Sequence, residues 1–370
     1  MVNFAEAVAR VPDLASGLMR LLPREFQEAF VQSPNVFMFF MSMGLAAVLI
    51  SAFWMLSGMG KASRVARIAL RAQALKRSKD HRALVLIGEI EGGDHLLRQE
   101  MKEAVEDNFG LFSFEQDVQV DLFPICLKTL APRAHPESRR RVAVEAADAL
   151  ERSAADVIIW GKRSWGRLDL RITTLPSYGR THEVQDIQLG WRTGRPDELV
   201  QRALAFVLAR KARPVLHRPQ DYKPERLQPI VEALDQMVEA KSAEVSEGLQ
   251  LDILSDFASG ALSLGERGGH IKWLSKSLDA RQRYLDRVDR TTDPASWGAA
   301  QQEIGRALTA LGEREGARDK LEEGASRLRL AMDALRSTDS LQQAEVALRA
   351  LQRAENTLQQ RRRVGLRWPG

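Results

Sequence analysis

The longest apolar stretch of the chain predicts a membrane-spanning helix. Residues 36–60 hold no charged side chain in 25 consecutive positions. A helix of that length rises roughly 37 Å, enough to cross a hydrocarbon layer of about 30 Å. Trp54 lies near the end of the run, where indole rings favour the membrane interface. A buried helix of a soluble domain is the alternative, but such helices rarely stay uncharged beyond about 14 residues. Residues 1–35 are predicted to form an amphipathic tail.

Residues 83–212 alternate short apolar runs with helical patterns, which predicts a small α/β domain. Pro124 makes the second strand either an edge strand or one that ends early. Gly166, among polar residues between the third and fourth strands, predicts a hairpin. The predicted order is β-α-β-α-β-β-β-α, with strands at 83–90, 118–127, 157–161, 167–175 and 182–189 and helices at 94–109, 137–152 and 196–211.

The stretch Ala149 to Leu175 resembles the small α/β domain of TolB and of FlgO-like and CsgG-like bacterial envelope proteins. The matching residues are Ala155, Asp156, Val157, Ile158, Ile159 and Gly161, with Leu168, Leu170 and Ile172 as the inward face of the return strand. The resemblance implies a binding or assembly module without catalysis. Many members of these families are in the periplasm or outer membrane.

The C-terminal part of the chain is predicted to be wholly helical. Four prolines fall five residues apart between Pro214 and Pro229, which predicts a stiff linker over 213–229 before helices over 230–370. The tetrapeptide LGER occurs at Leu264 to Arg267 and again 47 residues later, and a further step of 47 reaches Leu358. Internal repetition of this kind is typical of stacked helix pairs.

The second copy of the repeat is the clearest. A helix over 297–311 places Ile304 and Leu308 on one face, and Gly305 is small enough to let a neighbouring helix approach. Gly312 and Gly316 are predicted to bracket a turn before a second helix. The repeat motif consists of Trp297, Gln301, Ile304, Gly305, Leu308, Leu311 and Gly312.

This copy resembles a tetratricopeptide repeat of the longer-period bacterial type. The match covers the motif residues together with Ala307, Glu313 and Arg314, although the period is 47 and the first copy lacks the tryptophan. The resemblance implies a concave surface that binds a protein or peptide. The alternative is a helical bundle that serves as a spacer or as an oligomerisation element. In the second case the partner is another copy of the chain.

The charge distribution predicts the orientation in the membrane. The whole chain has a net charge of +5. Residues 61–82, predicted to form a basic juxtamembrane helix, contribute +7, so the remainder is net acidic. The positive-inside rule then places the N-terminus outside and the soluble domains in the cytoplasm. The protein is therefore predicted to cross the inner (plasma) membrane once. The cations expected at anionic headgroups, or alternatively on a solvated stalk, are Lys61, Arg64, Arg67, Arg71, Lys76, Arg77, Lys79 and Arg82.

Candidate chemistry is sparse. Gly88, Gly92 and Gly93 do not have the spacing of a nucleotide-binding loop, and neighbouring carboxylates would repel phosphate. The six histidines show no metal-ligand spacing, so neither a metal nor a cofactor is predicted. Cys126 lies in an apolar run and is expected to be a small buried hydrophobe. Nucleic acid is disfavoured as a partner because the basicity is confined to residues 61–82.

These patterns together predict an α+β multidomain protein with a single N-terminal transmembrane helix, a small α/β domain and C-terminal all-α repeats similar to tetratricopeptide repeats. The function expected is a non-enzymatic, membrane-tethered adaptor or scaffold, whose partners are membrane lipids and a protein or peptide. The alternative is a membrane-linked sensor whose α/β domain binds a small ligand between Gly88 and Asp94.

Overall fold

The computed structural model describes residues 43, 46–51, 65–78, 82–113, 118–129, 135–174, 184–194, 196–212, 219–240 and 242–367. The chain divides into two compact units, Met1–Arg67 and Ile68–Gly370. No helix among the described residues is long and apolar enough to cross a membrane. The predicted tail 1–35 and most of the predicted span 36–60 lie outside the described residues, which include only positions 43 and 46–51 of that span.

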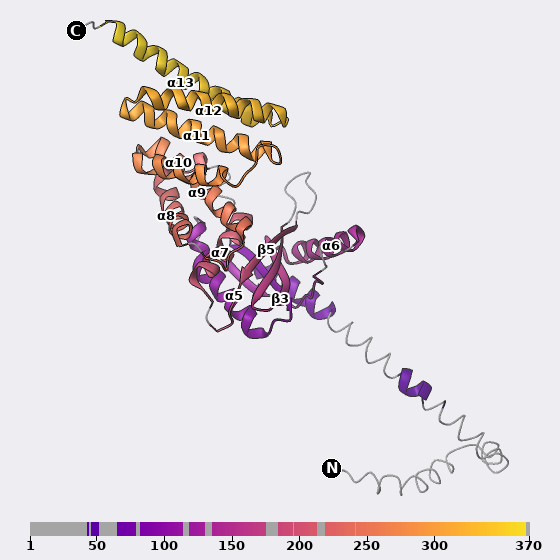
Figure 1. Cartoon of the computed structure of the whole chain (residues 1–370). Coiled ribbons are helices and arrows are strands. Elements are labelled where there is room, and N and C mark those ends of the chain that lie inside the picture. Colours follow the sequence, from indigo (N-terminus) through magenta and orange to yellow (C-terminus); the bar gives the residue numbers. More distant parts are fainter. Residues whose placement is uncertain are drawn as a thin grey trace, which may run out of the picture. The chain divides into compact units, whose positions relative to one another are not determined.

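The second unit has an α+β fold, in which a five-stranded mixed sheet is joined to a C-terminal helical region (Figure 1). The strand order is β2-β1-β3-β4-β5, with β1 parallel to both neighbours and the last two pairings antiparallel. The predicted order β-α-β-α-β-β-β-α over 83–212 is confirmed. The strands are β1 (Ala83–Glu91), β2 (Val118–Leu122), β3 (Val157–Ser164), β4 (Arg167–Thr174) and β5 (Val184–Gly190).

The second strand is an edge strand that ends early, as predicted from Pro124. β2 lies at one edge of the sheet and ends at Leu122, two residues before Pro124. Beyond it the chain stays close to β1, because the Phe123 N–H donates to the Ile87 carbonyl at 2.9 Å. Phe123, Ile125 and Leu127 point inward in this extended segment, and Cys126 points outward. The expectation that Cys126 is buried was therefore wrong: its thiol is exposed because it alternates with the inward residues.

Both faces of the sheet are covered. Val85 and Ile87 of β1 face one hydrophobic core, and Leu84 and Leu86 face another. This alternation follows from the two-residue period of a strand. The first face is covered by α5 (His95–Asn108), the short helix η1 (Phe109–Phe112) and α7 (Glu198–Ala212), and the second by α6 (Pro136–Ser153).

The basic segment 61–82 contains a helix over residues 65–78 that contributes to the second face. Ile68, Ala72 and Leu75 recur at helical spacing and pack into the same cluster as the inner residues of α6. Arg71 binds Asp121 of β2 through two hydrogen bonds, one of them 3.1 Å long from Nε to Oδ1. One side of this segment therefore packs on the sheet, which the charge pattern had not predicted.

The helical region consists of antiparallel helices that follow one another in sequence order (Figure 1). Its first helix begins at Pro224, inside the range 213–229 predicted to be a linker. The short helix η3 (Pro219–Asp221) precedes it. The helices are α8 (Pro224–Ala240), α9 (Glu247–Gly268), α10 (Ile271–Leu285), α11 (Pro294–Glu315), α12 (Arg318–Ser337) and α13 (Leu341–Arg367).

The sheet and the first helices of this region share one core. Leu234 of α8, Phe257 of α9 and Trp273 of α10 belong to the same apolar cluster as Val85 and Phe206 of the α/β part. The connection between α8 and α9 also covers the outer edge of β5, because the Gly190 N–H donates to the Glu244 carbonyl at 2.6 Å. The two domains separated in the sequence-based prediction are thus parts of one packed unit.

The pair α11 and α12 packs closely through glycines. Gly298, Gly305 and Gly312 recur every seven residues along α11 and face Leu335, Leu328 and Leu321 of α12. The predicted role of Gly305 is confirmed. Gly312 was predicted to start a turn, and this was wrong: it lies inside α11, where the returning helix needs the space, and the turn is at Gly316, with φ of 75°.

We expect Gly305→Ala to lower the free energy of unfolding. The added Cβ would lie 2.6 Å from the Leu328 Cγ and 2.9 Å from the Gly324 carbonyl oxygen. Such overpacking costs about 1–3 kcal/mol, more than the helix propensity of alanine returns. Urea unfolding followed by circular dichroism measures the change.

Gly248→Ala in α9 is the matched control, because no atom lies within 4 Å of its added Cβ. We expect this variant to gain up to about 1 kcal/mol. A Gly305→Ala protein that is as stable as Gly248→Ala would contradict the close packing of α11 and α12.

Candidate functional site

The helices of the C-terminal region repeat every 47 residues. α9, α11 and α13 begin at Glu247, Pro294 and Leu341, and the intervening α10 and α12 begin at Ile271 and Arg318. Equivalent helices therefore begin 47 residues apart, which is also the distance between the two LGER tetrapeptides. The same spacing includes α13, whose sequence retains little of the motif.

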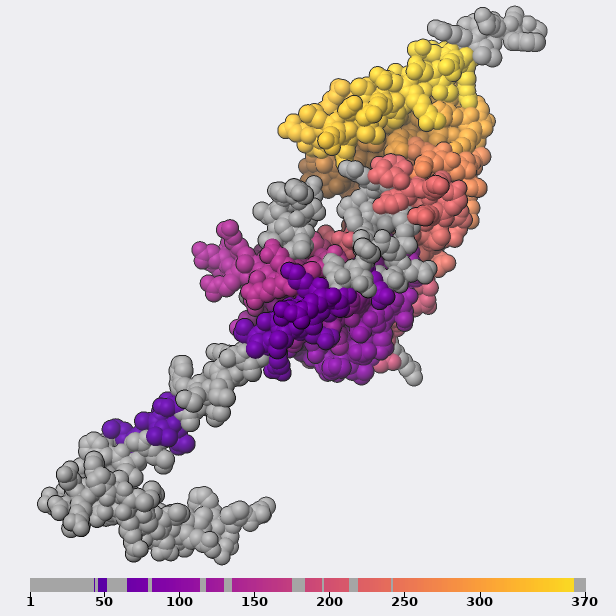
Figure 2. Space-filling view, turned by 180° about the vertical axis from the view of Figure 1, so that it is seen from behind, coloured from indigo at the N-terminus to yellow at the C-terminus, as the bar shows by residue number. Residues whose placement is uncertain are grey.

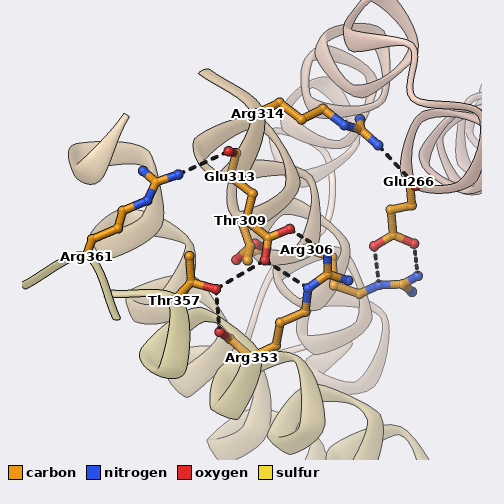
Figure 3. A network of polar contacts seen from close by, with 9 residues as sticks. Glu266, Arg306, Thr309, Glu313, Arg314, Arg353, Thr357 and Arg361 are labelled. Atoms are coloured by element: carbon orange, nitrogen blue, oxygen red, sulfur yellow. Dashed lines mark hydrogen bonds and ion pairs between the residues drawn. The ribbon is translucent and has the colours of Figure 1, made fainter. Parts of the chain in front are cut away.

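A ladder of polar contacts connects equivalent helices (Figure 3). Glu266 of α9 binds Arg306 of α11 through two hydrogen bonds, and Glu313 of α11 binds Arg353 of α13 in the same way. Both acceptors are the glutamates of the repeated motif, and both donors are 40 residues further along the chain. Bidentate guanidinium–carboxylate pairs specify geometry, so the ladder sets the register between successive repeats.

The arginine that ends each copy of the motif makes a second set of rungs. Arg314 and Arg361 each donate from Nη2, at 3.0 Å, to the carbonyl of the motif glutamate in the preceding copy (Figure 3). Arg267 has no preceding copy and donates instead to carbonyls of the segment that includes η3, among them that of Gln220 at 2.9 Å. Residues 219–222 therefore occupy the place of the C-terminal end of an earlier repeat helix.

The helices of the ladder line a groove of about 650 Å³. Figure 2 shows the recessed orange surface beside the overhanging yellow helix α13. The side chains that reach the groove are mainly guanidinium and carboxamide groups with a few small apolar ones. They are Gln220, Glu266, Gln302, Arg306, Thr309, Ala310, Gln343, Val346, Arg349, Ala350 and Arg353.

The arginines of the groove differ in exposure. The side chain of Arg306 is 29% exposed and those of Arg349 and Arg353 are 67% and 63% exposed. Burial alone would lower the pKa of Arg306, but the adjacent Glu266 carboxylate raises it above the ordinary value. Arg306 and Arg353 are both held in the ladder, by Glu266 and Glu313. Arg349 pairs with Glu345 of its own helix at 3.4 Å, and the side chains of Arg349 and Arg353 are largely in solvent. The groove therefore offers exposed planar donors, which suit carboxylates.

A buried arginine joins the first repeat, formed by α9 and α10, to the second, formed by α11 and α12. The Arg281 side chain is 6% exposed and donates from Nε to Glu303 of α11 at 2.6 Å. Its other nitrogens donate to Ser255 and Ser259 of α9 at 2.7–3.1 Å. A buried charge costs little only when it is paired and hydrogen-bonded, and this one is both. The contact joins α9, α10 and α11 at one point.

A second buried charge cluster lies where α7 meets α9. Arg210 of α7 lies 2.9 Å from Asp252 and 3.2 Å from Asp256 of α9. The pKa of Asp256 is raised to about 6, chiefly by burial; the charges of Asp252 and Glu303 also raise it, while those of Arg210 and Arg281 lower it. The α/β part is therefore joined to the repeats by charge as well as by the shared core.

The alternative ligand site, between Gly88 and Asp94, lies at the carboxyl end of β1. The chain passes from β1 to β2 through α5 on one face of the sheet and from β2 to β3 through α6 on the other face. The end of β1 is therefore a switch point, where open α/β sheets often bind ligands. However, the Asp94 carboxylate accepts the Leu97 N–H at 2.8 Å and caps α5. The place at which a helix would attract an anion is already filled by an anion of the chain.

The structure brings only part of the predicted site residues together. Of the basic set, Lys61, Arg64 and Lys79 lie outside the described residues, while Arg67, Lys76, Arg77 and Arg82 are exposed and Arg71 is held by Asp121. Of the repeat motif, Gln301, Ile304, Leu308 and Leu311 are buried, Gly305 and Gly312 face α12, and Trp297 is half-buried beneath the Arg290 guanidinium. The motif therefore builds the array, and other residues line the groove.

Sequence reasoning missed the groove residues, although one signal was present. A step of 47 residues carries Arg306 to Arg353, just as it carries the motif glutamate from 266 to 313. The ladder pairs therefore have a signal in the sequence, which is charge repeated at a step of 47 residues. Arg349 and Val346 have no such repeated partner, and only the structure places them in the groove.

Within the described part of the chain, no group of three or more His, Cys, Asp or Glu side chains could hold a metal ion. Comparisons with protein-family models, with curated proteins and with solved structures find no match for this chain. The resemblances to tetratricopeptide repeats and to the TolB and FlgO-like domain therefore stay predictions.

We expect Asp256→Asn to change how stability depends on pH. Because the folded-state pKa of Asp256 is about 6, above the ordinary 3.8, the folded protein binds this proton more tightly than the unfolded chain does. The contribution to stability is present at low pH and is lost as the pH rises through 6. The variant should therefore gain about 2–3 kcal/mol relative to the wild type between pH 4 and pH 7, in urea unfolding at each pH.

Asp289→Asn is a control with the opposite sign, because hydrogen bonds from Thr291 lower the pKa of Asp289. This variant should lose stability relative to the wild type as the pH rises, by a smaller amount. A difference between Asp256→Asn and wild type that stays constant from pH 4 to pH 7 would contradict the buried-carboxylate account.

Proposed function

We propose that this protein is a non-enzymatic, membrane-tethered adaptor that recruits a protein or peptide through the groove of its helical repeats. The observation that carries the proposal is the 47-residue array itself, in which α9, α11 and α13 line one groove of about 650 Å³. Arrays of stacked helix pairs present extended concave surfaces of this kind to partners. The predicted resemblance to tetratricopeptide repeats agrees with this role.

The lining of the groove suits an extended, acidic segment. Carboxamides such as those of Gln302 and Gln343 can both donate to and accept from a peptide backbone. The guanidinium groups of Arg349 and Arg353 pair with Glu345 and Glu313 of the chain, but both are largely exposed and keep further N–H donors for a carboxylate. Ala310 and Val346 supply small apolar contacts between the polar groups. The expected ligand is therefore a peptide with acidic side chains and an accessible backbone.

The tether is the uncharged run 36–60, followed by the basic segment 61–82. In this proposal the chain crosses the inner (plasma) membrane once, with its N-terminus outside and the unit Ile68–Gly370 in the cytoplasm. Part of the basic segment packs on the sheet through Ile68, Ala72 and Leu75. The cations Lys76 and Arg77 of that helix are exposed.

Charge reversal in the groove tests the proposal. We expect Arg349→Glu to reduce capture of the partner by the full chain at least tenfold, because it opposes an acidic ligand at an exposed groove position. The protein is isolated from detergent-solubilised membranes, and the proteins bound to it are compared by quantitative mass spectrometry. The full chain is used because the repeats cannot be separated from the sheet, with which α8 and α9 share their core.

Arg336→Glu on α12 is the matched control, since this exposed arginine lies outside the groove lining. It should retain the partner that Arg349→Glu loses. Identical sets of bound proteins for wild type and both variants would contradict recruitment through the groove. Self-association alone, seen as the same chain in differently tagged form, would replace the adaptor role with oligomerisation.

A further inference from the structure

The turn between β3 and β4 presents a fully exposed tryptophan. Ser164 pairs with Arg167, and the two residues between them form the turn. Trp165 is 104% exposed and has φ of 48°, and Gly166 has φ of 78°. Positive φ at both central residues is the pattern of a type I′ turn, which matches the twist of a hairpin.

Tryptophan is an unfavourable residue at this position. The first place of a type I′ turn strongly prefers Asn, Asp or Gly, because a bulky side chain with positive φ is strained. Trp165 gains no burial in return, since its ring is in solvent. Folding therefore gives no reason for this residue, and strain of this kind is typical of functional positions.

The neighbours of the tryptophan are cationic. Lys162 and Arg163 precede the turn and Arg167 follows it. None of the three forms an ion pair with a residue that the structure describes, although acidic residues are abundant elsewhere on the surface. Lys162 lies opposite Glu91 and Asp169 in the sheet, so the cations beside the indole are Arg163 and Arg167. An exposed indole between two cations suits an anionic lipid surface, where the ring lies among headgroups and each cation is attracted to phosphate.

The hairpin projects from the end of the sheet at which the chain joins the folded unit. Arg71, midway along the helix 65–78, binds Asp121, which pairs with Leu86 in the middle of β1. Since the helix ends at residue 78 and β1 begins at Ala83, the two run in opposite directions. Ile68 therefore lies towards the carboxyl end of β1, and so does the turn that follows β3, because β3 is parallel to β1.

We propose that the β3–β4 hairpin is a second membrane contact, in which Trp165 inserts at the interface and Arg163 and Arg167 bind anionic headgroups. The predicted span ends eight residues before Ile68, a connection of at most about 28 Å, so a tethered unit stays within reach of the bilayer. The choice of a lipid partner rests on the proposed tether. The test uses the unit Ile68–Gly370, which lacks the predicted span but retains the sheet and its complete core.

Trp165→Asn is the decisive variant. Asn-Gly is the most favourable sequence for this turn, so the variant should unfold at the same temperature as the wild type or higher. Binding is measured by co-sedimentation with phosphatidylcholine vesicles that contain phosphatidylglycerol, at low and high salt. We expect the wild-type unit to bind these vesicles and not pure phosphatidylcholine, and Trp165→Asn to bind at least tenfold more weakly.

Two further measurements separate insertion from simple charge attraction. Arg167→Gln should weaken binding about fivefold, the usual effect of one cation at an anionic surface. The difference in emission between wild type and Trp165→Asn reports Trp165 alone, and brominated lipids should quench it. Equal vesicle binding by wild type and Trp165→Asn, absence of binding by both, or no quenching would overturn the proposal.

The outcome is separable from that of the adaptor proposal. If the hairpin does not bind lipid, the full chain can still be membrane-bound through residues 36–60 and still capture its partner through the groove. If instead Trp165→Asn abolishes capture of a protein by the full chain while vesicle binding is absent, the hairpin is a protein-docking element and the lipid proposal is wrong.

Discussion

The structure depends on one constraint: a single pair of antiparallel helices cannot bury its apolar face by itself. The first helices of the array meet this constraint by packing on the α/β part. Leu234, Phe257 and Trp273 enter the same cluster as the inner residues of the sheet, and the α8–α9 connection covers the outer edge of β5. The sheet therefore serves as the base on which the first repeat is built, and each later repeat uses the one before it.

The means of attachment change along the array. Near the sheet the apolar cluster is large, whereas α12 and α13 are joined by small clusters made mainly of alanine and leucine. There the glycines of α11 and the Glu313–Arg353 rung contribute close approach and register. Gly298, Gly305 and Gly312 of α11 correspond, one step of 47 residues later, to Glu345, Gln352 and Gln359 of α13. Polar residues at these places are typical of a helix that caps an array.

The sequence was sufficient for the order of elements and for the repeat period, because both depend on local patterns. Alternation marked the strands, Pro124 marked the end of β2, and LGER marked the 47-residue step. It was not sufficient for contacts between distant segments. Pro224 was expected in a linker and begins α8, since proline is favoured in the first turn of a helix. The groove residues Val346 and Arg349 become neighbours of Glu266 only through stacking.

The central claim is that the sheet and the first repeat form one cooperative unit, and native-state hydrogen exchange of Ile68–Gly370 tests it most directly. The account predicts that the slowest amides of β3 and of α9 open with the same free energy, within about 1 kcal/mol, because they share one core. Amides of α13 should open at lower free energy. Protection of β3 that persists while amides throughout α9 exchange freely would show two independent domains and contradict the account.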